Sequence, residues 1–484
     1  MFKKIVSLVF AVMLTAAAPM FAQNNVQRYV DSIMKATPQL KNAAVAILAL
    51  DGRGRTIAEY NPDLPLLSAS TMKTVTTGAA LMALRPNFQF ETKIASAGET
   101  DQDGVLHGDV YIIGGGDPTL GSRCSCANDI NAVFGEWANA LKNAGITAID
   151  GKIIGDSGFF PGEMTHDNWC WEDLGANYGS APCGLSYGEN TSYFYVEPGP
   201  EEGAPLQISP VGMVYSGMDV RNDAITGAIK TGNKLNYYAS DLSPVGRFTG
   251  TYACDRKADT VTVANRFPAL TCAEAFDTYL AADGIPTGGA TTGAAPDTAL
   301  FLTGTFSPTL LEICRETNYK SNNFFAETIF MHLGLCLEGE ASYESTPVAV
   351  EKYISDLGCS TTGLKQDDGS GLSRQNYVTP SFFCNFYRMM QKSDIFAAYF
   401  STLPTPGCEG TLKYVLPNEP MQLRRRIHCK SGSMSGVRCY AGYVETASGD
   451  LLSFAILVNN FDCPMREIKP KVEGFLKQLA LYDR

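Results

Sequence analysis

Hydrophobic positions near both ends of the chain follow helix and hairpin patterns. Residues 25–37 (NVQRYVDSIMKAT) and residues 466–482 carry apolar side chains at helical spacing, so each segment predicts a helix, the first of them amphipathic. Residues 42–62 contain two short apolar runs joined by DGRG, and residues 437–460 contain two more around TASGD. Each pair of runs predicts a β-hairpin.

The middle of the chain has a different pattern. From about residue 90 to 284, short β-like runs are broken by Gly, Asp and Pro, and residues 284–300 predict a linker rich in Gly, Ala and Thr. Helical spacing returns at residues 307–335. These patterns predict one α/β domain, built from both ends of the chain and interrupted by a β-rich insertion.

One predicted helix contains an unexpected charge. Residues 66–84 (LLSASTMKTVTTGAALMAL) predict a buried helix whose single charged residue is Lys73. A lysine is almost never buried unless it is paired or used. Ser70 lies three positions earlier on the same helical face, so the lysine amine can reach the serine hydroxyl. Because burial lowers the pKa of a lysine, the two residues could act as nucleophile and base.

The Ser-x-x-Lys spacing alone is a weak signal, because the chain repeats it at Ser32–Lys35, where the lysine can simply face solvent. A second triplet is more specific. Ser-x-Asn occurs once, at Ser321–Asn323. Asn323 could hold a substrate amide and contact Lys73, while the Ser321 hydroxyl could relay a proton. The alternative is a polar loop that caps the next helix.

A third triplet, Lys-[Ser/Thr]-Gly, occurs twice. KTG at residues 230–232 precedes Ser321 and has polar surroundings, which are typical of a surface turn. KSG at residues 430–432 follows Ser321 and opens the predicted C-terminal hairpin. An edge strand there could pair with an extended peptide, and Gly432 would let the substrate backbone approach closely. Order and context favour the second triplet.

The N-terminal segment and the composition indicate where the protein is located and which partners and cofactors are excluded. Residues 1–22 have the charged, apolar and small-residue regions of a secretory signal peptide, and no later run is long enough for a transmembrane anchor. A net charge of −12 argues against nucleic acid as a partner. The sequence has four histidines and no HExxH motif, so we expect no metal or other cofactor.

The fourteen cysteines of an exported chain favour disulfides over metal ligation. The only close pair is Cys124-x-Cys126. Spacing does not determine the pairing, although Cys429 and Cys439 are candidates because they flank a predicted strand and its neighbour.

Together these segments resemble the class C low-molecular-mass penicillin-binding proteins, which are serine D-Ala-D-Ala carboxypeptidases and endopeptidases acting on peptidoglycan. The ordered triplets carry the resemblance, with GGGDPTL (114–120), DGSGLSRQNYVTP (368–380) and KSGSMSGVRCYAGYV (430–444). The resemblance implies a transpeptidase-like domain, in which a mostly antiparallel sheet is flanked by helices. That domain would comprise residues 23–88 and 300–484. Insertion domain II would comprise residues 89–180 and 262–299, and a nested domain III residues 181–261.

The resemblance also implies a role for each motif residue. Ser70 would be the acyl-enzyme nucleophile and Lys73 its base. Ser321 and Asn323 would shuttle protons and hold the substrate amide. The remaining implied groups are the carboxylate-binding Lys430 and Ser431, the adjacent Gly432, and an oxyanion hole formed by the backbone N–H groups of Ser70 and Ser433.

Two positions depart from the family pattern, since Asn322 replaces an aspartate and Ser431 a threonine. One further residue, Asp156 in GDSGFF, is implied to bind a cationic stem-peptide side chain, although a turn-forming aspartate is an equally good interpretation.

The leading hypothesis is therefore an exported serine D,D-peptidase that acts on peptidoglycan stem peptides and muropeptides and binds β-lactams covalently. An esterase or transpeptidase using the same acyl-enzyme is a second hypothesis. A non-catalytic muropeptide-binding protein is a third, and the intact nucleophile and lysines argue against it. The sequence does not determine the oligomeric state.

Overall fold

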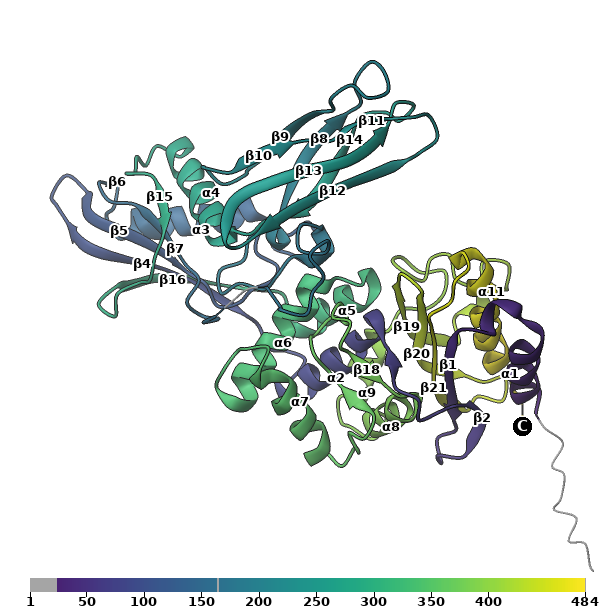
Figure 1. Cartoon of the computed structure of the whole chain (residues 1–484). Coiled ribbons are helices and arrows are strands. Elements are labelled where there is room, and N and C mark those ends of the chain that lie inside the picture. Colours follow the sequence, from purple (N-terminus) through teal and green to yellow (C-terminus); the bar gives the residue numbers. More distant parts are fainter. Residues whose placement is uncertain (1–23, 163–164, 484) are drawn as a thin grey trace, which may run out of the picture.

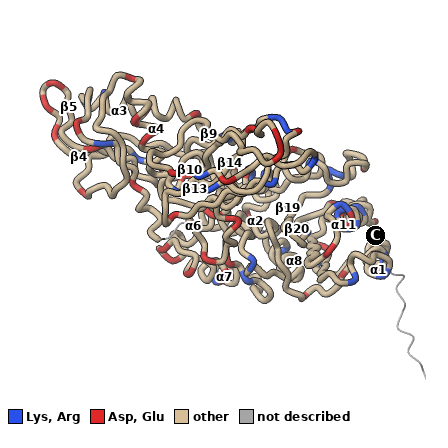
Figure 2. Tube along the Cα trace, turned by 45° about the horizontal axis from the view of Figure 1, so that its top comes forward, with Lys and Arg blue, Asp and Glu red and all other residues tan. Residues whose placement is uncertain are grey.

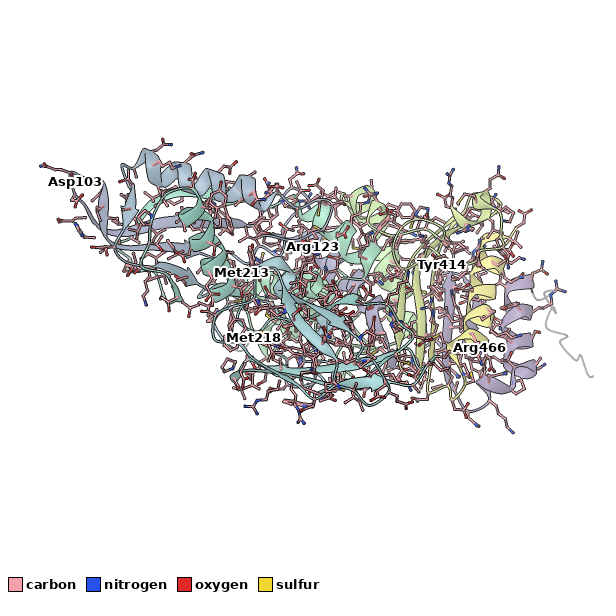
Figure 3. All side chains as sticks on the ribbon, turned by 90° about the horizontal axis from the view of Figure 1, so that it is seen from above. Asp103, Arg123, Met213, Met218, Tyr414 and Arg466 are labelled. Carbon is pink, nitrogen blue, oxygen red and sulfur yellow. The ribbon has the colours of Figure 1, made fainter. Side chains whose placement is uncertain are left out.

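The computed structural model describes residues 24–162 and 165–483, so the predicted signal peptide lies outside the described residues. The molecule is elongated, with a lobe of helices and one sheet at the lower right and β-rich layers at the upper left (Figure 1). The first lobe contains the predicted catalytic residues and is called the catalytic lobe below. In Figure 3, Asp103 marks the tip of the β-rich end and Arg466 lies at the opposite end. Acidic and basic residues are scattered over both parts of the chain (Figure 2).

The catalytic lobe is built around a five-stranded antiparallel sheet with the order β19-β20-β21-β1-β2. Both predicted hairpins are confirmed, because β1 pairs with β2 and β20 with β21. The ends of the chain meet where β1 pairs with β21 along its whole length. The strands are β1 (Ala44–Leu50), β2 (Thr56–Tyr60), β19 (Ile427–Met434), β20 (Val437–Glu445) and β21 (Leu451–Asn459).

Helices cover both faces of this sheet, so its strands are apolar on both sides. In β20, Cys439 and Tyr443 pack toward one helical layer, and Tyr440 and Val444 pack toward the other. The layer that packs against Cys439 and Tyr443 contains α2 (Lys73–Ala83), α5 (Leu310–Lys320), α6 (Asn323–Glu338), α7 (Ser345–Asp356), α8 (Pro380–Met390) and α9 (Phe396–Ser401). The opposite layer contains α1 (Asn25–Ala36) and α11 (Met465–Ala480), two helices that the sequence predicts.

The insertion begins with a six-stranded sheet packed against two helices, α3 (Ile130–Asn143) and α4 (Pro268–Ala282). Its strands are β4 (Glu91–Thr100), β5 (Val105–Ile113), β6 (Ala148–Ile149), β7 (Ile153–Asp156), β15 (Ala290–Thr292) and β16 (Leu300–Phe306). The prediction of a plain linker at residues 284–300 is partly wrong, because β15 pairs in parallel with β7. Strand β16 also pairs with β4 in this sheet, and not with the catalytic sheet.

Two smaller sheets complete the insertion, and they enclose a core of their own that includes Phe194, Phe248 and Tyr252. One contains β8 (Thr191–Glu197), β9 (Gln207–Val211) and β14 (Asp259–Ala264). The other contains β10 (Asp219–Asn222), β11 (Ile225–Gly227), β12 (Asn233–Ser240) and β13 (Ser243–Ala253). The predicted fold class, an α/β chain with a β-rich insertion, is confirmed. Among the described helices, none has both the length and the apolar character needed to cross a membrane.

The expected disulfides are not formed, since all fourteen cysteines are free thiols. The candidate pair Cys429 and Cys439 is wrong for a geometric reason. Cys429 lies opposite Gly442 and Cys439 opposite Gly432, so the two are out of register. They also point to opposite faces of the sheet, because Cys429 packs with the α1–α11 layer and Cys439 with the other layer. The sulfurs of Cys124 and Cys126 lie 3.2 Å apart.

Because both faces of the five-stranded sheet are buried, removing a side chain from either face should destabilise the fold. Ile456 in β21 is fully buried in the layer that faces α1 and α11. We expect Ile456→Ala to lower the free energy of unfolding of the catalytic lobe by about 2–5 kcal/mol, because it leaves a cavity. The control Leu481→Ala removes a half-exposed side chain and should lower it by less than about 1 kcal/mol. Thermal denaturation followed by circular dichroism compares the two, and equal shifts would contradict this account.

Candidate active site

A cleft of about 370 Å³ opens between the helical layer and the edge strand β19. Four of the predicted residues line it, namely Ser70, Ser321, Asn323 and Ser433. The other lining residues come from the loop after β17 (Leu364–Lys365), from the end of β19 and from the insertion: Gly371, Leu372, Arg374, Met434, Ser435, Glu172, Asp173 and Tyr178. The cleft is therefore assembled from several distant chain segments.

Ser70 lies on a short 3₁₀ turn, Ala69–Met72, which leads directly into α2. Ala69 has φ +44°, in the left-handed region that favours glycine. Such backbone strain persists only where the surrounding structure over-determines it, and it is common at functional sites. The turn is half-buried at Ser70 and lies against β19 and Gly371.

Lys73, the first residue of α2, is completely buried. Its Nζ lies 3.0 Å from Ser70 Oγ, 2.6 Å from Asn323 Oδ1 and 2.7 Å from the Ser370 carbonyl oxygen. An ammonium group would donate to all three oxygens. A neutral amine would donate to Asn323 and Ser370 only, which leaves its lone pair directed at the Ser70 hydroxyl. The geometry fits a base that accepts a proton from Ser70.

Burial lowers the pKa of the Lys73 ammonium to about 7, against the opposing charges of Glu327 and Asp368. Burial, followed by the charge of Asp368, raises the pKa of Glu327 to about 8. Hydrogen bonds from the backbone N–H groups of Gly369 and Ser370 to the Glu327 carboxylate, at 2.9 and 2.7 Å, act in the opposite direction. Burial thus brings the pKa of Lys73 close to neutral pH, where a substantial fraction of the lysine carries a neutral amine.

Sequence reasoning did not assign a role to Glu327 or Asp368. Both are fully buried, and Asp368 receives hydrogen bonds from the Trp169 indole, the Asn376 amide and the Gly371 N–H. This network fixes the loop that presents the Ser370 carbonyl to Lys73. For Glu327 a signal existed, because it is an acidic residue in the apolar segment FFAETIF, just as Lys73 is a basic residue in an apolar helix.

The Ser-x-Asn triplet forms the junction between α5 and α6. Ser321 ends α5 in the left-handed conformation with φ +60°, and Asn322 caps α6 by accepting from the Phe325 N–H. The two interpretations of the triplet are therefore compatible, because Asn322 caps the helix while its neighbours Ser321 and Asn323 occupy the predicted catalytic positions. Asn323 begins α6, where its Oδ1 contacts Lys73 and its Nδ2 donates to the Tyr178 carbonyl at 2.8 Å.

The KSG triplet lies on β19, at the open edge of the sheet. Lys430 is fully buried, and its Nζ donates to Ser321 Oγ at 2.9 Å and to the Ser431 carbonyl at 2.7 Å. Burial and the nearby charges of Lys73 and Arg438 lower the pKa of Lys430 well below its usual value. Ser431 is buried beside it, whereas Ser433 is exposed in the cleft.

The structure gives a steric reason for glycine at position 432, which the sequence did not reveal. A Cβ at this position would lie 2.6 Å from the Ser68 carbonyl oxygen and 3.2 Å from the Ser70 nitrogen. The glycine therefore lets β19 pack directly against the turn that carries the nucleophile. The prediction that Gly432 makes room for the substrate backbone stays a prediction.

The remaining predicted positions lie elsewhere. Asp156 is not among the residues that line the cleft, and its carboxylate accepts from the N–H groups of Gly158 and Ala295, each at 2.8 Å. Residues 230–232 form a turn before β12 in the insertion. Ser32 and Lys35 are exposed on α1. The structure does not bring these residues to Ser70.

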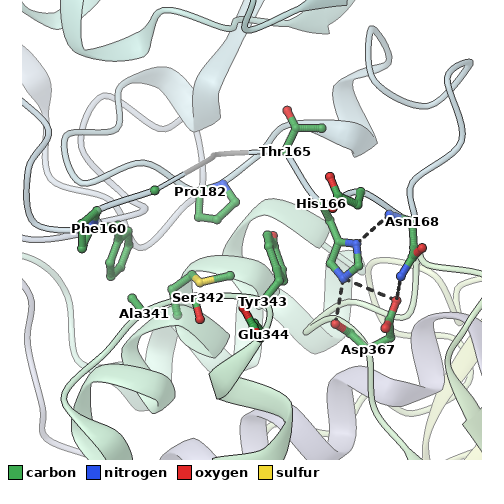
Figure 4. Close-up of a pocket in the computed structure, with 14 residues that line it drawn as sticks. Phe160, Thr165, His166, Asn168, Pro182, Ala341, Ser342, Tyr343, Glu344 and Asp367 are labelled. Carbon is green, nitrogen blue, oxygen red and sulfur yellow. Dashed lines mark hydrogen bonds and ion pairs between the residues drawn. The ribbon is translucent and has the colours of Figure 1, made fainter.

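A second cavity, of about 480 Å³, is lined by residues that include His166, Tyr343 and Asp367 (Figure 4). His166 projects into it, with Nε2 2.9 Å from the Asp367 carbonyl oxygen, and Asn168 donates to the Asp367 carboxylate at 3.1 Å. Asp367 precedes Asp368, so this cavity and the Lys73 network share one loop. None of the predicted catalytic residues lines it.

Residues 26–479 match the profile of the D-Ala-D-Ala carboxypeptidase 3 (S13) family. The chain belongs to this family. The relatives of this chain include the D-alanyl-D-alanine carboxypeptidase of Actinomadura sp. (strain R39), which is 29% identical over 450 residues, covering 90% of this chain and 81% of the relative. The D-alanyl-D-alanine carboxypeptidase DacB of Haemophilus influenzae is 25% identical over 478 residues, covering 96% and 94%.

Solved structures agree on the fold. The crystal structure of penicillin binding protein 4 (dacB) from Haemophilus influenzae superimposes with a TM-score of 0.81 at 24% identity, covering 95% of this chain and 100% of that chain. The family predicted from the ordered triplets is confirmed, and so is its enzyme class, a serine-type D-Ala-D-Ala carboxypeptidase.

The depressed pKa of Lys73 predicts the pH dependence of acylation. Only the neutral amine can accept the Ser70 proton, so the rate should rise about tenfold per pH unit below pH ~7 and level off above it. Stopped-flow acylation by a chromogenic β-lactam between pH 5 and 9 measures the profile. The control Lys230→Ala, in the distant turn, should leave its midpoint unchanged. A rate that stays flat across pH ~6–8 would contradict a neutral lysine base.

The packing of Gly432 predicts a second effect. Gly432→Ala would push β19 away from the Ser70 turn, and we expect acylation to slow on the order of tenfold or more, because small displacements of reacting groups are costly. Gly52→Ala is the matched control, since an added Cβ there meets no atom within 4 Å. Full activity of Gly432→Ala would show that the close contact with Ser68 is not needed.

Proposed function

We propose that this protein is an exported serine D,D-peptidase that cleaves the D-Ala-D-Ala terminus of peptidoglycan stem peptides through an acyl-enzyme on Ser70. The proposal rests above all on the buried Lys73 amine, 3.0 Å from the Ser70 hydroxyl with its other two partners already placed. No histidine lies among the residues that line the cleft, and Lys73 holds its amine within hydrogen-bond distance of the Ser70 hydroxyl.

Acylation begins when Ser70 Oγ attacks the carbonyl carbon of the penultimate D-Ala and its proton passes to Lys73 Nζ. The backbone N–H groups of Ser70 and Ser433 stabilise the resulting oxyanion, which develops only in the transition state. The tetrahedral intermediate collapses by breaking the C–N bond. The departing amine of the terminal D-Ala takes a proton from the Ser321 hydroxyl, which Lys430 at 2.9 Å can replenish. Water then adds its hydroxyl to the acyl carbon and gives a proton to Lys430 through Ser321. Lys73 returns its proton to Ser70 Oγ as the ester C–O bond breaks, which releases the shortened peptide and restores both lysines.

The substrate would be held along the edge strand. An extended peptide can add to β19 through main-chain hydrogen bonds. Asn323 would contact the substrate amide, and Lys430 with Ser431 would attract the terminal carboxylate. Asp156 remains the predicted partner of a cationic stem-peptide side chain, with its carboxylate at present bound to two backbone N–H groups.

The same acyl-enzyme could also hydrolyse D-Ala–diamino acid cross-links, and it would react with β-lactams, whose strained amide mimics D-Ala-D-Ala. The predicted signal peptide at residues 1–22 supports export to the cell envelope, where muropeptides are found. An esterase or transpeptidase would use the same first step with a different substrate or acceptor. A non-catalytic muropeptide-binding protein would need no low-pKa lysine at a serine.

Covalent labelling separates the enzyme from the binding protein. The wild type incubated with benzylpenicillin should gain one adduct, which peptide mass spectrometry locates at Ser70, and it should release D-alanine from purified pentapeptide muropeptides. Ser70→Ala should lose both activities, by at least about a thousandfold for hydrolysis. Ser32→Ala, at the other Ser-x-x-Lys sequence, should retain both. No adduct on the wild type, or an equal adduct on Ser70→Ala, would refute the proposal. The muropeptide masses also distinguish cleavage of termini from cleavage of cross-links.

A further inference from the structure

Two hydrogen bonds connect the insertion to the Ser321–Asn323 turn. Asn323 Nδ2 donates to the Tyr178 carbonyl at 2.8 Å, and Asn322 Nδ2 donates to the Glu189 carboxylate at 2.7 Å. Tyr178 lies in the loop before β8, and Glu189 in the short turn that leads into β8. The motif that touches Lys73 and Lys430 is thus held from outside the catalytic lobe.

Glu189 is firmly placed by its own surroundings. It has φ +58°, between Gly188 at +59° and Asn190 at +50°, so three successive residues adopt the left-handed conformation. Asn190 is completely buried and donates to the Ala181 carbonyl at 2.8 Å. The other oxygen of the Glu189 carboxylate accepts from Ser122 Oγ at 2.6 Å. The carboxylate is therefore presented to Asn322 by a turn with little freedom.

The side chain of Asn322 uses both ends of its amide. Its Oδ1 accepts from the Phe325 N–H and caps α6, while its Nδ2 donates to Glu189. An aspartate could cap the helix equally well but could not donate to a carboxylate. It would instead place two negative charges within hydrogen-bond distance. Glu316 is a further acidic neighbour of Glu189: burial raises the pKa of Glu316, the charge of Lys320 opposes this, and the charge of Glu189 adds to it.

We propose that Glu189 is a positioning residue for the reaction, and that the asparagine at position 322 is the complement of its charge. Asn322 lies between two residues that touch the catalytic lysines, Ser321 on Lys430 and Asn323 on Lys73. A displacement of Asn322 moves both contacts. The inference rests on the proposed function, because its consequence is measured as the rate of Ser70 acylation.

The test is a double-variant cycle read by acylation with a chromogenic β-lactam. Asn322→Asp should slow acylation on the order of tenfold, through like-charge repulsion against Glu189. Glu189→Gln should change it by less than about threefold, because a glutamine still accepts from Asn322. The double variant should recover to within about threefold of the wild type, because the introduced glutamine can donate to the introduced aspartate. Glu201→Gln, in an exposed turn of the insertion, is the matched control.

Rescue distinguishes positioning from a general loss of stability, which a second substitution would only worsen. Thermal denaturation of all variants checks that each is folded at the assay temperature. A fully active Asn322→Asp, or a double variant no faster than Asn322→Asp, would overturn the proposal. A wild type that forms no adduct on Ser70 would instead refute the proposed function itself.

Discussion

Keeping the Lys73 amine out of water while it touches the Ser70 hydroxyl is the constraint on which the catalytic lobe depends. The desolvation of an ammonium group is offset only in part by the nearby carboxylates, so the pKa of Lys73 falls to about 7 and its neutral amine becomes available near neutral pH. The arrangement requires a hydrogen-bond partner for each N–H group of the lysine amine, and apolar side chains packed around α2. Asn323, the Ser370 carbonyl and the helical layer supply these.

The groups around this lysine come from segments that are far apart in sequence. α2 brings the nucleophile and base, the α5–α6 junction brings Ser321 and Asn323, and β19 brings Lys430. The insertion contributes hydrogen bonds to the α5–α6 junction and part of the wall of the cleft. The insertion is therefore part of the framework of the site. The segments that precede and follow it in the sequence still form one catalytic lobe.

The sequence predicts the features that depend on local patterns, such as the helices, the hairpins and the order of the motifs. A charge inside an apolar helix identified Lys73, and motif order selected Lys430 over Lys230. What it missed depends on tertiary contacts. Neither the face to which Cys429 and Cys439 point nor the pairing of β15 with β7 follows from composition, because register and sheet order are properties of the whole fold. The carboxylate of Asp156 accepts from two backbone N–H groups, and its role toward a cationic side chain stays a prediction.

The pairing of β1 with β21 also sets when activity can appear during synthesis of the chain. β1 and Ser70 emerge from the ribosome early, but β21, one of the two strands that flank β1, is among the last segments made. The partners of Lys73 at Asn323 and Ser370 lie 250 and 297 positions further along the chain. Until they arrive, Lys73 is a solvated, protonated lysine and Ser70 an ordinary hydroxyl. The Ser70–Lys73 pair is therefore complete only after the α5–α6 junction and the loop that carries Ser370 have folded onto α2.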